Sequence, residues 1–124
     1  MDAELKPLSH YQRLSRAELE ALQFAKLKAQ AERLWATNPF YRALWQAAKV
    51  SPESLRRPED IRRFPTVRKA DFVADQAEAP PFGRRLGVPV EEVRLIAMTS
   101  GTSGQGQEIY GLSLIHISEP TRPY

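Results

Sequence analysis

Cysteine is absent from this chain of 124 residues. Its absence excludes disulfides, thiolate metal sites and a cysteine nucleophile, and it fits a reducing compartment, so we expect a cytoplasmic protein. Histidine is nearly as scarce, and His10 and His116 stand far from any carboxylate–serine pattern. Each is therefore interpreted as an ordinary polar residue. No segment approaches the ~18 consecutive apolar residues of a membrane span, and residues 1–6 lack the apolar stretch of a signal peptide.

The chain also lacks a concentrated block of charge. It has 18 Lys and Arg against 15 Asp and Glu, a net charge of +3. Much of the basic excess comes in pairs that acidic residues interrupt: Arg56, Arg57, Arg62, Arg63, Arg68, Lys69, Arg84 and Arg85. A nucleic-acid surface is usually more concentrated and interleaved with exposed aromatic residues. We therefore expect a solvated basic face and no nucleic-acid partner; salt-sensitive nucleic-acid binding stays as a weaker alternative.

Two helices are signalled near the N-terminus. Ser15 and Glu18 form a capping-box pattern, which predicts a helix that runs to about Thr37. Asn38 followed by Pro39 predicts the start of a second helix. Apolar residues recur at helical spacing in both segments: Phe24, Leu27, Ala31, Leu34 and Trp35, then Phe40, Tyr41, Leu44, Trp45 and Ala48. We interpret this aromatic-rich stripe as a packing surface.

Proline interrupts the chain repeatedly after residue 50. Only short helices fit between the prolines, at about 58–63 and 69–75, and Thr66 is a possible cap for the second. Residues 1–14 show no clear period. An apolar run rich in β-forming residues predicts a strand at 93–98.

The strand leads into a loop of hydroxyls and glycines. Three of the six glycines fall between residues 101 and 106. Glycine permits positive φ and close approach of a ligand, and successive N–H groups then form an anion-binding nest. Hydroxyls of neighbouring residues add donors. The loop therefore predicts a phosphate site, although the composition alone fits a flexible linker about equally well.

Several better-known loops are excluded. A Walker loop needs Lys and Ser or Thr after its last glycine, where Gln107 and Glu108 stand. The dinucleotide fingerprint fails because Ile109 occupies the place of its third glycine. A nucleophile elbow needs a residue between its serine and the next glycine, but Gly104 follows Ser103 directly. We assign no catalytic residue and no metal ligand.

The loop, Thr99-Ser100-Gly101-Thr102-Ser103-Gly104, resembles the signature phosphate loop of adenylate-forming enzymes, the acyl-CoA synthetase superfamily. Segments 15–23, 38–42 and 61–72 are similar to the N-terminal region of phenylacetate–CoA ligases. The resemblance covers nearly all of residues 11–111. Two positions depart from the family pattern, since Gln105 stands where many members have Lys and Gly106 where Pro is frequent.

The resemblance implies an α/β fold, of which this chain would hold the N-terminal helices, the first strand and the phosphate loop of an incomplete large domain. It implies that a small carboxylic acid attacks the α-phosphate of ATP to give an acyl-adenylate and pyrophosphate, after which coenzyme A displaces AMP. The loop would hold the β- and γ-phosphates with Mg²⁺ assisting. This role carries over to Thr99, Ser100, Gly101, Thr102, Ser103 and Gly104. The acid and the oligomeric state stay open.

The end of the chain has a different character. Residues 112–124 match an in-frame translation of a transposase sequencing adapter, so we expect 1–111 to be the N-terminal fragment of the AMP-binding domain and 112–124 a non-native tail. A genuine edge strand at 112–117 is the alternative. We expect the fragment alone to be inactive. A second hypothesis is a small helical binding module that docks a partner on the Trp35 and Trp45 face.

Overall fold

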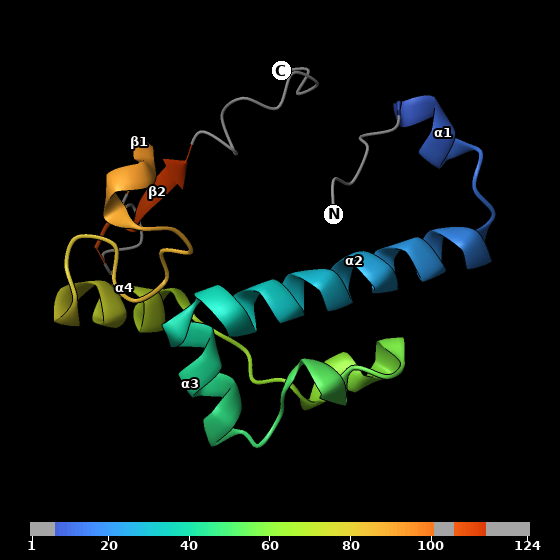
Figure 1. The fold of residues 1–124 in the computed structure, drawn as a ribbon, viewed down its shortest axis with the longest axis horizontal. Coiled ribbons are helices and arrows are strands. Elements are labelled where there is room, and N and C mark those ends of the chain that lie inside the picture. Colours follow the sequence, from blue (N-terminus) through green and yellow to red (C-terminus); the bar gives the residue numbers. More distant parts are fainter. Residues whose placement is uncertain (1–6, 101–105, 114–124) are drawn as a thin grey trace.

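The computed structural model describes residues 7–100 and 106–113. In chain order the elements are α1 (Leu8–Gln12), α2 (Arg16–Thr37), α3 (Pro39–Ala47), the 3-10 helices η1 (Pro52–Ser54) and η2 (Pro58–Arg63), α4 (Lys69–Glu78), the 3-10 helix η3 (Val90–Glu92), β1 (Val93–Met98) and β2 (Ile109–Ser113). The long helix α2 runs along the molecule, and α3 turns away from its C-terminal end (Figure 1). Helix α4 and the β1–β2 hairpin lie together at that same end.

The two predicted helix starts are confirmed. Ser15 Oγ accepts from the N–H of Glu18 at 3.2 Å, and the Glu18 carboxylate accepts from the N–H of Ser15 at 2.7 Å, so the capping box begins α2. Asn38 caps α3 by accepting from the N–H of Tyr41 at 3.2 Å, with Pro39 in the first turn. Helix α1 was not expected, because its five residues are too few to show a period.

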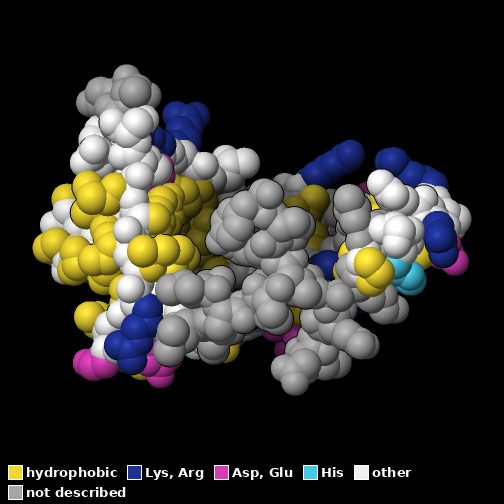
Figure 2. All heavy atoms as spheres, turned by 90° about the horizontal axis from the view of Figure 1, so that it is seen from above, with side chains coloured by type: hydrophobic (Ala, Val, Ile, Leu, Met, Phe, Trp, Pro, Cys, Tyr) yellow, Lys and Arg dark blue, Asp and Glu magenta, His cyan; other side chains and the backbone are white. Residues whose placement is uncertain are grey.

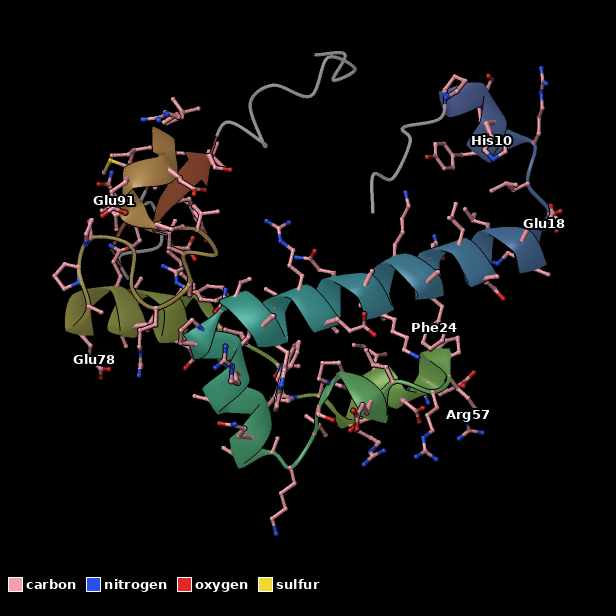
Figure 3. All side chains as sticks on the ribbon, viewed as in Figure 1. His10, Glu18, Phe24, Arg57, Glu78 and Glu91 are labelled. Carbon is pink, nitrogen blue, oxygen red and sulfur yellow. The ribbon has the colours of Figure 1, made fainter. Side chains whose placement is uncertain are left out.

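The α2–α3 pair carries the main core. Ala31, Trp45, Val50 and Leu55 are buried together, and the partly buried residues around them are Phe24, Leu34, Trp35, Tyr41, Leu44 and Phe64. The rings of Trp35 and Trp45 stack with centroids 6.4 Å apart, and Phe24 points from α2 toward η2 (Figure 3). The stripe is therefore a packing surface, as predicted, although Leu27 stays 36% exposed.

The proline-rich connector differs in detail from the prediction. Residues 58–63 form a 3-10 helix, a form that is common in short connecting segments. Helix α4 begins where expected but extends to Glu78. The cap predicted at Thr66 is wrong, because the N-cap residue is Arg68. Asp71 in the first turn accepts from the N–H of Arg68 at 2.8 Å and so satisfies one of the free donors of this helix end.

The predicted strand is confirmed as β1, which pairs antiparallel with β2. A register shift falls between Val93 and Leu95. Large apolar side chains stay exposed on this hairpin and beside it: Val90, Leu95, Ile96, Met98 and Tyr110. Apolar side chains gather over this end of the molecule in Figure 2. Strand β2 crosses the domain boundary predicted after Gly111, and that boundary stays a prediction.

The helices of the described ranges, 7–100 and 106–113, include none with the length and hydropathy of a membrane span.

Candidate functional site

The predicted phosphate loop leaves β1 at Thr99, and its base is closed by one residue pair. The N–H of Thr99 donates to the carbonyl of Glu108 at 3.0 Å, and the N–H of Glu108 donates to Thr99 Oγ1 at 2.9 Å. The threonine hydroxyl therefore takes the place that a backbone carbonyl has in an antiparallel ladder. The base of the loop is fixed by β1 and β2 together.

The residues that the structure describes include only two of the six predicted phosphate-binding residues, Thr99 and Ser100. Thr99 is half-buried and uses its hydroxyl oxygen as an acceptor, while Ser100 is exposed. Gly101, Thr102, Ser103 and Gly104 lie outside the described residues, as does Gln105. Their role in phosphate binding stays a prediction.

The limb that descends from the loop, residues 106–109, lies against α4. Gln76 Nε2 donates to the carbonyl of Gln107 at 3.0 Å, and Gln76 Oε1 accepts from the N–H of Ile109 at 2.8 Å. Gly106 has φ +95°, and a Cβ there would lie 3.5 Å from Val73 Cγ1. Proline fixes φ near −65° and could not adopt this conformation. The positive φ at residue 106 therefore fits the glycine found here and not the proline that is frequent in the family.

A buried carboxylate holds the segment that precedes the hairpin. The side chain of Asp75, only 1% exposed, accepts from the N–H of Arg84 at 2.9 Å and from Arg84 Nε at 3.0 Å. Arg85 Nε lies 3.3 Å from Asp75 Oδ2, the oxygen that also accepts from the N–H of Arg84. Gly83 lies directly over Asp75, with φ +67° and no room for a Cβ. One acidic side chain on α4 thus anchors two consecutive arginines.

Arg85 joins α4 to β2. Its guanidinium lies over the ring of Phe72, 4.6 Å from the centroid, and over that of Tyr110 at 5.3 Å. Its side chain is 8% exposed, so the expectation of a solvated basic face is wrong here: the Asp75 carboxylate and the two aromatic rings stabilise the guanidinium in place of water. Burial raises the pKa of the nearby Tyr41, and the charge of Arg85 partly opposes this rise.

The backbone of the same segment is tied to the α2–α3 junction. Asn38 Nδ2 donates to the carbonyl of Arg85 at 3.0 Å, and the N–H of Phe40 donates to the carbonyl of Arg84 at 3.2 Å. The two arginines therefore connect the helical core, α4 and β2. The sequence marked them only as a charged pair. It carried no signal for Asp75 beyond its place at the end of a predicted helix, and none for Gln76, which follows the predicted end of that helix.

A cleft of about 420 Å³ opens between the C-terminal half of α2 and the hairpin. Its lining includes Leu34, Phe82, Leu86 and Tyr110, and it includes neither Thr99 nor Ser100. No group of three or more His, Cys, Asp or Glu residues that could hold a metal ion occurs within 7–100 and 106–113. The donors that the described part of the loop offers are hydroxyls and backbone N–H groups.

Comparison with known proteins identifies relatives along most of the chain. The chain is 38% identical over 92 residues to a phenylacetate–coenzyme A ligase of Thermus thermophilus. It is 36% identical over 88 residues to the enzyme of that name from Escherichia coli. The alignments cover 74% and 71% of this chain. No family model matches the chain.

Solved structures agree with these relatives. A 2-hydroxyisobutyryl-CoA ligase in complex with 2-HIB-AMP superposes with a TM-score of 0.77 over 90% of this chain at 28% identity. An open conformation of that ligase, in complex with 2-HIB-AMP and CoA, also gives 0.77. Over most of its length, the chain is therefore similar to one portion of these acid–coenzyme A ligases.

The chain spans about a fifth of the length of the curated ligases, 20% and 19%, and 24% of the solved ligase. The helices and the two-stranded sheet therefore represent one portion of the ligase fold, as the α/β expectation requires.

Proposed function

We propose that this chain supplies the phosphate-binding loop of an enzyme that joins a small carboxylic acid to coenzyme A at the expense of ATP. In the first step the carboxylate attacks the α-phosphate of ATP, which gives an acyl-adenylate and releases pyrophosphate. In the second step the thiol of coenzyme A attacks the acyl carbon, which forms a thioester and releases AMP. The phosphate-binding residues are Thr99, Ser100, Gly101, Thr102, Ser103 and Gly104.

The observation that carries the proposal is the closed base of the loop in a chain related to these ligases. Thr99 and Glu108 bind each other through two hydrogen bonds, so the ends of the intervening segment are held at one fixed spacing. Loops that a rigid strand pair presents are common carriers of binding sites. The solved relative binds 2-HIB-AMP and CoA, which supports an acyl-adenylate and coenzyme A as the ligands of the whole enzyme.

The hydroxyl and N–H donors of the loop fit a nucleotide whose phosphates already hold Mg²⁺. Hydroxyls such as those of Thr99 and Ser100 can contact phosphate oxygens, and Mg²⁺ in such sites is held mostly by substrate phosphates and water. When bound, the ion would neutralise charge on the triphosphate. The residues of this chain would orient the β- and γ-phosphates through N–H and O–H donors. The absence of cysteine supports the cytoplasm as the compartment of this enzyme.

Pyrophosphate release tests the proposal. The full-length protein encoded by the source gene should release pyrophosphate from ATP with at least one acid of a panel of aryl and aliphatic carboxylic acids. Alanine at Ser100, Thr102 and Ser103 together should weaken ATP use strongly, whereas Thr99→Ser, which keeps the acceptor for Glu108, should be tolerated. A folded protein that turns over no acid, or full activity in the triple variant, would contradict the assignment.

A further inference from the structure

The carboxamide of Gln76 behaves as a substitute for a neighbouring strand. In an antiparallel pair, the backbone groups of successive residues point to opposite edges. The N–H and carbonyl of Glu108 face Thr99, so the carbonyl of Gln107 and the N–H of Ile109 face the outer edge. Gln76 Nε2 and Oε1 bind these two groups at 3.0 and 2.8 Å. One side-chain amide thus satisfies the pair that a peptide group of another strand would bind.

We propose that Gln76 is a positioning residue for the phosphate loop. It holds the descending limb, residues 106–109, on α4 and so fixes where the C-terminal end of the phosphate loop begins. The inference rests on the proposed function of the loop. The position of Gly106 supports it: a Cβ there would lie 3.5 Å from Val73 Cγ1, and residues 73 and 76 lie three apart and share one face of α4.

Only a carboxamide matches both backbone groups. An alanine removes the donor and the acceptor. An ionised glutamate keeps the size and the acceptor for Ile109, but it places a second acceptor against the carbonyl of Gln107. Gln76→Ala and Gln76→Glu should therefore change nucleotide binding in the same direction, and the second variant keeps the length of the side chain if the first folds poorly. Gln46, an exposed glutamine of α3, provides the matched control.

The experiment measures kcat and KM on the full-length protein encoded by the source gene, by pyrophosphate release. Gln76→Ala should raise KM for ATP about tenfold, the effect expected from losing two neutral hydrogen bonds at the base of the loop. KM for the acid and for coenzyme A should stay unchanged, and Gln46→Ala should behave as wild type. A purely structural role would lower the active fraction, hence the apparent kcat, and leave KM for ATP unaltered.

Hydrogen exchange gives a second measurement on the 124-residue chain. The N–H of Ile109 should exchange at least about tenfold faster in Gln76→Ala than in wild type, because its acceptor is lost. An unchanged KM for ATP in an active Gln76→Ala enzyme, or an unchanged exchange rate at Ile109, overturns this inference and leaves the proposed function intact. A wild-type protein that consumes no ATP overturns both.

Discussion

Replacing Asp75 with alanine should destabilise the chain more than any other single change of an acidic side chain within the described residues. The substitution removes the partner of a guanidinium whose side chain is 8% exposed, and it leaves Arg85 with a buried, uncompensated charge. Breaking a buried ion pair from one side costs about 3–5 kcal/mol. Arg84 adds little, because its side chain is 52% exposed and exposed pairs contribute about 0–1 kcal/mol.

Two features place the expected loss near the lower end of that range. The rings of Phe72 and Tyr110 remain near the Arg85 guanidinium and keep a cation–π stabilisation of about 1–2 kcal/mol. The N–H of Arg84 loses its carboxylate acceptor but can reach water once the site loosens. We therefore expect a loss of about 3 kcal/mol in the free energy of unfolding, a large share of the 5–15 kcal/mol that is typical of a domain.

Urea unfolding followed by tryptophan fluorescence and far-UV circular dichroism measures this loss. Glu78→Ala is the control, because that carboxylate is 71% exposed and lies 3.5 Å from Arg84 Nη2; its effect should stay below about 1 kcal/mol. The double variant Asp75→Ala with Arg85→Met should recover part of the stability, since no unpaired charge is then buried. A loss below about 1 kcal/mol for Asp75→Ala, or a double variant no more stable than the single one, would refute the reasoning.

Three further changes test other parts of the fold. Lys49 has φ 56° after the end of α3, so Lys49→Gly should raise the free energy of unfolding by about 0.5–1 kcal/mol in a thermal melt; a lower stability would contradict this. Trp45 is 7% exposed, so Trp45→Ala should cost about 3–5 kcal/mol and lower the unfolding midpoint rather than release a partner from a folded chain. The hydrogen bonds from Ser15, its N–H first and its hydroxyl second, lower the pKa of Glu18 below the ordinary 4.5. The stabilisation by this carboxylate should be complete above pH 4.5 and disappear as the pH falls through the folded pKa, and Glu18→Gln should remove that contribution to the pH dependence of stability in urea unfolding at a series of pH values.

Local signals explain the part of the fold that the sequence could predict. The capping box at Ser15 and the Asn38–Pro39 pair act within three residues, so they are visible in the sequence and reappear in the structure. The cap of α4 was missed because the groups that satisfy it are the N–H of Arg68 and the carboxylate of Asp71, and the sequence offered a hydroxyl nearby as a competing choice.

Contacts between distant segments explain what could not be predicted. Gln76 meets its partners 31 and 33 residues further along the chain, and nothing in helical periodicity distinguishes it from an exposed glutamine. Arg85 belongs to a charged pair, which usually indicates a solvated surface. Its burial follows only from the placement of Phe72 and Tyr110 on two elements that fold against it.

These distant contacts also show which part of the chain supports the loop. The α2–α3 core reaches the loop through the segment at Arg85, whose carbonyl binds Asn38 and whose guanidinium lies against Asp75 and Tyr110. Helix α4, which carries Asp75, also carries Gln76, and Gln76 binds the descending limb, residues 106–109. On the β1 side of the loop, the described residues offer the pairing of Thr99 with Glu108. The loop is therefore held asymmetrically, and a substitution on α4 should disturb phosphate binding more than an equally mild one on the exposed face of β1.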